Sequence, residues 1–124
     1  ELYANSDFVS VHIPATPETK GSINNALLIR MPQGAVLVNT ARKEVINEDE
    51  LIQFMQIRKD FKYVTDIMPA ADQKMQELFE GRYFATPKKM GAQTAEANIN
   101  AGIAAAKQIV DFLVNGNTRF QVNK

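Results

Sequence analysis

Arg42 is the residue whose type and position most clearly suggest chemistry. It follows a short apolar run, residues 35–38, and then Asn39, Thr40 and Ala41. Such a run predicts a strand buried on both faces of a parallel sheet, and open α/β sheets bind ligands beyond the carboxyl ends of their strands. A guanidinium keeps its charge, and its planar fork matches a carboxylate. Arg42 therefore predicts a carboxylate-binding site, with a plain surface arginine in a strand-to-helix loop as the alternative.

Three further polar segments follow apolar runs that we expect to be strands. Residues 12–14 end the first run, Asp66 ends the third, and residues 86–89 follow the fourth. The carboxyl ends of parallel strands meet at one edge of a sheet, so four such segments predict a single site there. His12 is the single histidine of the chain, and a lone histidine at a strand end can equally be structural.

The sequence argues against several other kinds of site. It contains neither a glycine-rich dinucleotide loop nor a nucleoside-triphosphate loop. It has no cysteine, so we expect no disulfide, thiolate nucleophile or cysteine metal site. The acidic run at residues 48–50 is interpreted as the solvated start of a helix and not as a metal site.

The elements that must position these residues alternate between strands and helices. This alternation predicts a parallel sheet with right-handed crossovers. The expected strands cover residues 8–13, 34–39, 61–65 and 83–85, and the expected helices cover residues 25–31, 47–58 and 73–79. Asn24 is expected to cap the first helix, and Asn47, with Glu50 three residues on, to start the second.

The longest expected element is a helix over residues 94–114. Its apolar residues recur at three- and four-residue steps and mark one helical face, comprising Ile99, Ile103, Ala106, Val110 and Leu113. Gly116 follows as a helix stop. Residues 120–123 are expected to add an edge strand.

Composition limits the class of protein and its partners. A chain of 124 residues is one domain or part of a larger one. Its 14 basic residues balance 14 acidic residues, which argues against attraction to nucleic acid or to an anionic membrane. No apolar run reaches bilayer length, and the amino end is not a targeting peptide; together with the lack of cysteine this fits a cytoplasmic protein. The chain begins with Glu1, and we expect it to be a fragment.

The segments named above, together with residues 6–11 and 16–19, resemble the D-2-hydroxyacid dehydrogenases in order and spacing over nearly the whole chain. The resemblance implies an α/β fold: residues 1–90 are the C-terminal half of a Rossmann-type parallel sheet that binds NAD. Residues 91–124 are then a long connecting helix and tail that return to the substrate domain. The glycine-rich loop and most of the substrate domain would lie upstream, so the fragment alone is expected to be inactive.

The resemblance also implies partners and residue roles. Residues 86–98 are similar to a lysine-bearing subgroup of D-3-phosphoglycerate dehydrogenases, which implies a 2-hydroxy acid substrate, 3-phosphoglycerate, and a homodimer. Arg42 would hold the substrate carboxylate and polarise the 2-carbonyl, and Lys88 stands where the family usually has its acid/base histidine. Asp66 would meet the nicotinamide carboxamide. The implied NAD-binding residues are His12, Ile13, Pro14, Thr40, Ala41, Arg42, Asp66 and Gly91.

Two further positions depart from the family pattern. The glutamate that orients the family's histidine falls at Ala71, with Asp72 beside it but one residue out of register, and Lys43 replaces the glycine that normally follows the arginine. The joint loss of histidine and glutamate fits a catalytic set built on Lys88. It also fits a non-catalytic, corepressor-like family member that binds a dinucleotide. A third possibility is an α/β domain without a site, and the choice between NAD and NADP depends on an acidic residue upstream.

Overall fold

The computed structural model describes residues 1–88 and 93–123. The chain divides into two compact units, Glu1–Lys89 and Met90–Lys124, and each is described by itself. Within the described residues, no helix has both the length and the apolar character needed to cross a membrane.

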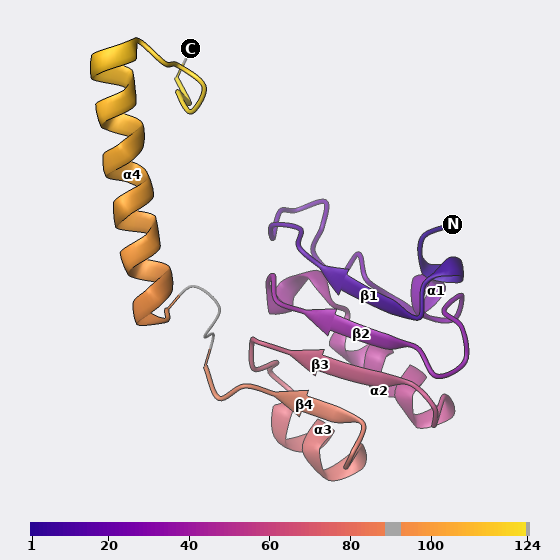
Figure 1. Cartoon of the computed structure of the whole chain (residues 1–124). Helices are drawn as coiled ribbons and strands as arrows, with labels where there is room; N and C mark the ends of the chain where they lie inside the picture. The colour runs from indigo at the N-terminus through magenta and orange to yellow at the C-terminus, as the bar shows by residue number, and fades with distance from the viewer. Residues whose placement is uncertain (89–92, 124) are drawn as a thin grey trace. The chain divides into compact units, whose positions relative to one another are not determined.

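The first unit is built on a parallel sheet whose strand order follows the chain. The strands are β1 (Phe8–Val11), β2 (Val36–Asn39), β3 (Lys62–Thr65) and β4 (Tyr83–Ala85). All neighbouring pairs are parallel, so the four arrowheads in Figure 1 point to the same edge. The parallel α/β sheet expected from the sequence is therefore confirmed.

β1 is shorter than the sequence indicated. Its last residue, Val11, pairs with Asn39, which is also the last residue of β2. The ladder ends there because β2 offers no further partner, so His12 and Ile13 lie in the following loop and the expected strand at residues 8–13 is two residues too long.

Three helices connect the strands, and two of them begin where side-chain caps were expected. They are α1 (Asn25–Leu28), α2 (Glu48–Ile57) and α3 (Asp72–Leu78), with short 3₁₀ turns η1 (Tyr3–Asn5) and η2 (Lys43–Val45). Asn24 Oδ1 accepts the Leu27 amide at 3.3 Å, and Asn47 Oδ1 accepts the Glu50 amide at 3.2 Å. These bonds satisfy amides that a helix start leaves without an intrahelical partner.

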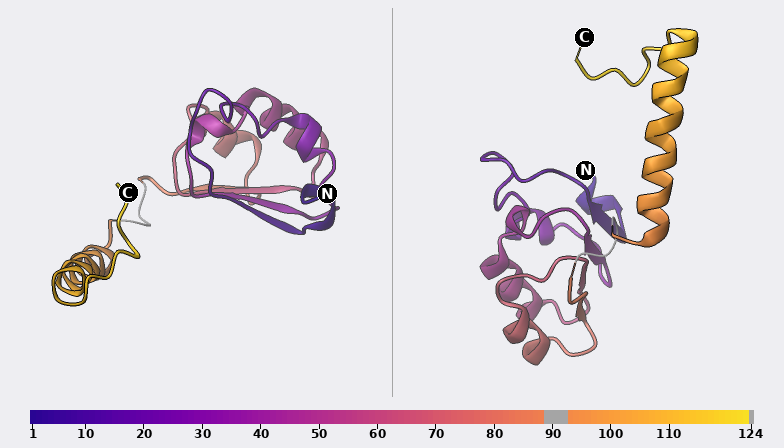
Figure 2. Two further views of the ribbon diagram at one scale, coloured as in Figure 1. Left: turned by 90° about the horizontal axis from the view of Figure 1, so that it is seen from above. Right: turned by 90° about the vertical axis from the view of Figure 1, so that its left-hand side faces the viewer.

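The helices of this unit all lie on one face of the sheet, as Figure 2 shows from above. Alternate strand residues point into the core beneath them, and Leu37 and Tyr63 are almost fully buried. The expectation that β2 is buried on both faces is wrong for this unit: Val36 is only half-buried, and Phe8 on the open face is 73% exposed. The core cluster includes Leu28, Val45, Leu51, Met55, Phe61, Met75 and Phe79.

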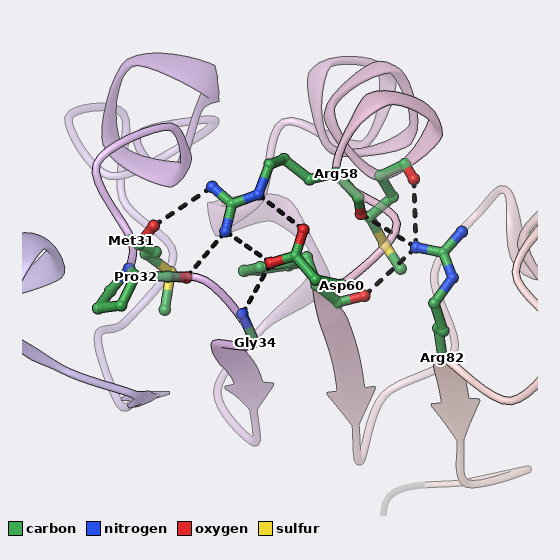
Figure 3. A network of polar contacts seen from close by, with 8 residues as sticks. Met31, Pro32, Gly34, Arg58, Asp60 and Arg82 are labelled. Carbon is green, nitrogen blue, oxygen red and sulfur yellow. Dashed lines mark hydrogen bonds and ion pairs between the residues drawn. The ribbon is translucent and has the colours of Figure 1, made fainter.

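An ion pair stabilises the amino edge of the sheet, opposite the polar loops (Figure 3). The Arg58 guanidinium donates two bonds to the Asp60 carboxylate, at 2.9 and 2.8 Å. It also donates to the carbonyl oxygens of Met31 and Pro32, at 3.3 and 2.8 Å. Asp60 in turn accepts the Gly34 amide at 2.7 Å. The turn before β2 and the turn before β3 are thereby tied to one bidentate pair, a geometry that strengthens charge-assisted bonds.

Arg82 extends this arrangement to the start of β4. Its Nη1 donates to the carbonyl oxygens of Met55, Arg58 and Phe61, at 3.2, 3.1 and 3.3 Å (Figure 3). Its guanidinium carbon lies 5.2 Å from the centre of the Phe79 ring. Carbonyl groups at the end of α2, which lack helical partners, are satisfied in this way.

The second unit contains one long helix, α4 (Ala95–Asn115). Thr94 Oγ1 caps it by accepting the Ala97 amide at 3.1 Å, and Gly116 ends it at a φ of +65°, which favours glycine. The expected helix is confirmed. The edge strand expected at residues 120–123 is wrong: these residues form a turn and coil, in which the Gln121 amide donates to the Thr118 carbonyl oxygen at 3.0 Å.

Replacing Asp60 with asparagine should lower the free energy of unfolding by about 2 kcal/mol at neutral pH. The Arg58 side chain, followed by the Gly34 amide, holds the pKa of Asp60 well below its usual range. A carboxyl group with a lowered folded-state pKa stabilises the fold above its unfolded pKa and loses that contribution as the pH falls. The difference between wild type and variant in urea unfolding should therefore shrink below about pH 4.

Asp49→Asn is the matched control, because Asp49 is an exposed acid at the start of α2. It should change the free energy of unfolding by less than about 0.5 kcal/mol. A gap between wild type and Asp60→Asn that stays constant from about pH 7 to about pH 3 would contradict the role of the ionised carboxylate.

Candidate functional site

The four polar segments lie directly after the four strands, and therefore all at the carboxyl edge of the sheet (Figure 1). Residues 12–14 follow β1, residues 40–42 follow β2, Asp66 follows β3, and residues 86–88 follow β4. Exposure differs among them: Ala41 is buried, Thr40 and Asp66 are half-buried, and His12, Ile13, Pro14, Arg42 and Lys88 are exposed. Gly91 lies outside the described residues.

The loop that presents Arg42 is held by the residue that ends β2. Asn39 Oδ1 accepts the Ala41 amide at 3.0 Å, and Asn39 Nδ2 donates to the Arg42 carbonyl oxygen at 3.0 Å. The backbone of Arg42 is extended, and η2 begins at the next residue, Lys43. These bonds define the path of the loop while the arginine side chain stays exposed.

The Arg42 guanidinium has a backbone partner. Its Nη1 donates to the Ala41 carbonyl oxygen at 2.8 Å. In the part of the chain that the structure describes, the ion pair is Arg58–Asp60, and Arg42 belongs to none. Its remaining donors can therefore take a ligand carboxylate without breaking an ion pair among those residues.

Asp66 and Thr86 join the ends of β3 and β4. The Thr86 hydroxyl donates to Asp66 Oδ1 at 2.9 Å, and the Thr86 amide donates to the Thr65 carbonyl oxygen at 3.0 Å. The Asp66 amide donates to the Asn39 carbonyl oxygen at 3.0 Å. Three of the four loops are thus linked in a row, and Lys88 stands two residues beyond the last link.

The first loop is held by contacts of its own. His12 Nε2 shares a 2.7 Å hydrogen bond with Ser10 Oγ, and the Pro14 carbonyl oxygen accepts the Thr19 hydroxyl at 2.6 Å. The Ser10 contact uses one ring nitrogen of His12, which agrees with the structural alternative for this residue and leaves the other nitrogen for a ligand.

Glu48 is a site-edge residue that sequence reasoning missed. Its two carboxylate oxygens accept the amides of Ala70 and Ala71, each at 3.1 Å, and so fasten the segment between β3 and α3 to the start of α2. The only sequence signal was an acidic residue at a helix start, which indicates a favourable position in the helix dipole but names no partner 22 residues away. Among the described residues, no group of three or more histidine, cysteine, aspartate or glutamate side chains is placed to hold a metal ion.

Comparison with known families agrees with this geometry. Residues 1–87 match the NAD-binding domain of the D-isomer specific 2-hydroxyacid dehydrogenases. The chain belongs to this family. It is 34% identical to D-3-phosphoglycerate dehydrogenase of Haemophilus influenzae, over 99% of this chain and 31% of that protein. It is also 34% identical to hydroxypyruvate reductase of Thermotoga maritima, over 87% of this chain and 36% of that protein.

Solved structures include a relative with its cofactor. The crystal structure of NAD⁺-bound 3-phosphoglycerate dehydrogenase from Entamoeba histolytica is 50% identical, with a TM-score of 0.80 over 99% of this chain and 40% of that one. The present chain therefore spans less than half the length of these D-2-hydroxyacid dehydrogenases.

The contacts of Asp72 bear on whether it can substitute for the glutamate that the family resemblance implies. Asp72 stands beside Ala71, the position where the sequence resemblance places the family's glutamate. Its Oδ1 accepts the Tyr83 hydroxyl at 2.5 Å, and its Oδ2 accepts Gln76 Nε2 at 2.8 Å. Both oxygens are thus occupied on the helical side of the sheet, which disfavours Asp72 as a substitute for the missing glutamate.

Tyr83, which donates to this carboxylate, pairs with Tyr63 across β4 and β3. Their rings stack with centroids 5.9 Å apart. Burial, followed by the bond to Asp72, raises the pKa of Tyr83, and burial raises the pKa of Tyr63. Both hydroxyls therefore remain protonated at neutral pH: that of Tyr83 donates to Asp72, and that of Tyr63 accepts the Asn39 Nδ2 contact.

Replacing Glu48 with alanine should release the segment between β3 and α3. The Ala70 and Ala71 amides lose their acceptors, so their hydrogen exchange, followed by mass spectrometry or NMR, should accelerate by about tenfold or more. Asp49→Ala, one residue further along α2 and exposed, is the matched control. If exchange at both amides is as slow in Glu48→Ala as in the control, other contacts hold this segment.

Proposed function

We propose that this chain is the C-terminal part of the NAD-binding domain of a dehydrogenase that oxidises 3-phospho-D-glycerate to 3-phosphohydroxypyruvate, the first step of serine biosynthesis. The observation that carries the proposal is the linkage of the Arg42 loop, Asp66 and Thr86 at one edge of the sheet. The 50% identity to an NAD⁺-bound 3-phosphoglycerate dehydrogenase supports the substrate.

Arg42 would bind the substrate carboxylate and polarise the carbon that is oxidised. Its guanidinium is exposed and outside any ion pair among the described residues. A bidentate pair with a carboxylate fixes orientation as well as charge, and a positive charge beside the 2-oxygen stabilises the negative charge that develops there.

The carboxyl edge of the sheet also suits a dinucleotide. When bound, NAD supplies the hydride acceptor. We propose that Asp66, with Oδ1 already oriented by Thr86, accepts the nicotinamide carboxamide amide group, while Thr40 and Ala41 contribute backbone contacts nearby. The exposed residues His12, Ile13 and Pro14 would line the adenosine side, and Gly91 is retained from the sequence resemblance alone.

Lys88 would accept the proton of the substrate hydroxyl. Its exposed position two residues after Thr86 lies on the loop that Asp66 anchors. This assignment fits the absence of a carboxylate at position 71, because an amine has no tautomer that a neighbouring acid must select.

A second candidate function is a non-catalytic family member that binds a dinucleotide and regulates a partner. The observation that favours it is the environment of Asp72, whose carboxylate is turned to Tyr83 and Gln76. Asp72 then does not replace the glutamate at the proton-transfer step. Turnover by the complete polypeptide that contains this sequence separates the two candidates.

The domain assignment follows from the same proposal. Residues 1–90 would be half of the NAD-binding domain, and residues 91–124 would return to the substrate domain. The open sheet face, where Phe8 is 73% and Phe84 is 60% exposed, supports burial against further chain. We accordingly expect the 124 residues alone to be inactive, and the complete protein to be a homodimer.

Replacing Arg42 with lysine in the complete polypeptide should lower kcat/KM for 3-phosphoglycerate by at least about thirtyfold, equivalent to roughly 2 kcal/mol of transition-state stabilisation. Lysine keeps the charge but loses the planar fork. Arg30→Lys is the matched control, because Arg30 is exposed after α1 and away from the carboxyl edge. Steady-state kinetics with an efficiency equal to that of the control would remove Arg42 from the site.

Replacing Lys88 with methionine should abolish turnover and leave NAD affinity within about threefold of wild type, because methionine keeps the bulk but cannot accept a proton. Lys59→Met changes an exposed lysine at the other edge of the sheet and serves as control. Calorimetry reports NAD binding and steady-state assays report kcat. A raised KM with unchanged kcat would mean that Lys88 binds substrate phosphate, and the general-base role would be withdrawn.

A further inference from the structure

Asn39 is an unusual residue for the end of a buried strand. It is fully buried, and with Thr65 it is one of two buried polar residues in the described chain. Asparagine is disfavoured in strands, and burying an amide costs free energy unless each polar atom is bonded. An apolar residue would fill the same strand position without needing hydrogen-bond partners. Packing alone therefore does not explain why asparagine occupies position 39.

The side chain of Asn39 forms hydrogen bonds with the backbone before and after the Arg42 α-carbon. Oδ1 accepts the Ala41 amide at 3.0 Å, which closes a local side-chain turn. Nδ2 donates to the Arg42 carbonyl oxygen at 3.0 Å, and its second contact is the Tyr63 hydroxyl at 3.5 Å. The loop therefore leaves β2 along one path, although the Arg42 side chain itself is exposed.

The backbone of Asn39 serves the neighbouring loop. Its carbonyl oxygen accepts the Asp66 amide and the Thr65 hydroxyl, both at 3.0 Å. Any residue at position 39 retains this carbonyl, whereas only the amide side chain makes the bonds to Ala41 and Arg42. Substitution of the Asn39 side chain therefore removes bonds to the Arg42 loop and leaves the backbone bond to Asp66 in place.

We propose that Asn39 is a positioning residue that directs Arg42 towards the substrate carboxylate. This inference rests on the function proposed for Arg42. A flexible side chain binds productively only when its backbone origin is fixed, and small displacements of a positioning group reduce the rate strongly. The Nδ2 bond to the Arg42 carbonyl oxygen is the contact that provides this restraint.

Asn39→Ser in the complete polypeptide is the test, because serine can keep the turn to the Ala41 amide through its hydroxyl but cannot reach the Arg42 carbonyl oxygen. We expect kcat/KM for 3-phosphoglycerate to fall by about tenfold, with NAD affinity within about twofold of wild type. The matched control is Asn24→Ser, where asparagine accepts one amide as a helix cap and serine caps equally well.

A double-mutant cycle with Arg42→Lys distinguishes a positioning role from a merely structural one. A structural role of Asn39 would lower kcat/KM equally whether residue 42 is arginine or lysine. If Asn39 acts through Arg42, Asn39→Ser should cost less than about twofold in the Arg42→Lys background. Equal losses in both backgrounds, or no loss in the single variant, would overturn the inference alone. If Arg42→Lys itself loses nothing, the proposed role of Arg42 fails first and the inference fails with it.

Hydrogen exchange of the unmodified protein keeps the inference testable if the variant does not fold. The Ala41 amide should exchange at least about tenfold more slowly than the amide of an exposed loop residue such as Ala15. Exchange as fast as that of Ala15 would mean that the Asn39 turn is not maintained in solution, and it would overturn the inference.

Discussion

The register between β2 and β3 is the constraint on which the candidate site depends. It sets Asn39 beside Thr65 as the last pair of the ladder. The Asn39 side chain can then hold the Arg42 loop while its carbonyl oxygen holds Asp66. A slip of one residue would turn the side chain of Asn39 to the open face of the sheet, and both loops would lose their common anchor.

The arginines at the two edges of the sheet differ in how many bonds they make within the protein. At the amino edge Arg58 is committed to Asp60, and Arg82 is committed to three carbonyl oxygens (Figure 3). At the carboxyl edge the Asn39 amide and the carboxylates of Asp66 and Glu48 make the structural bonds. The exposed Arg42 donates to a single carbonyl oxygen there. The fold is thus stabilised without using the cation that we propose for substrate binding.

Sequence patterns correctly predicted the features that depend on residues close together in the chain. The strand–helix alternation, the asparagine caps and the glycine stop after α4 are short-range features, and the structure confirms them. The Glu48 bonds to Ala70 and Ala71, and the Arg58 bond to Pro32, join residues 22 to 26 positions apart, so no periodicity indicates them. The prediction of an edge strand at residues 120–123 was wrong, because strand-forming residues form a strand only when they pair with another strand. Here they form a turn and coil.

The sequence resemblance sets Ala71 and Lys88 against the family's glutamate and histidine, and under the role proposed for Lys88 the two differences depend on each other. An imidazole needs a neighbour that selects its tautomer and ring orientation, and in most of the family the glutamate has that role. A lysine amine has neither a tautomer nor a plane to select, so the proton-transfer role that we propose for Lys88 requires no acid to orient it. The backbone amides of Ala70 and Ala71, just before α3, donate to Glu48 at the start of α2. The carboxylate of Glu48 therefore holds the backbone of the segment between β3 and α3.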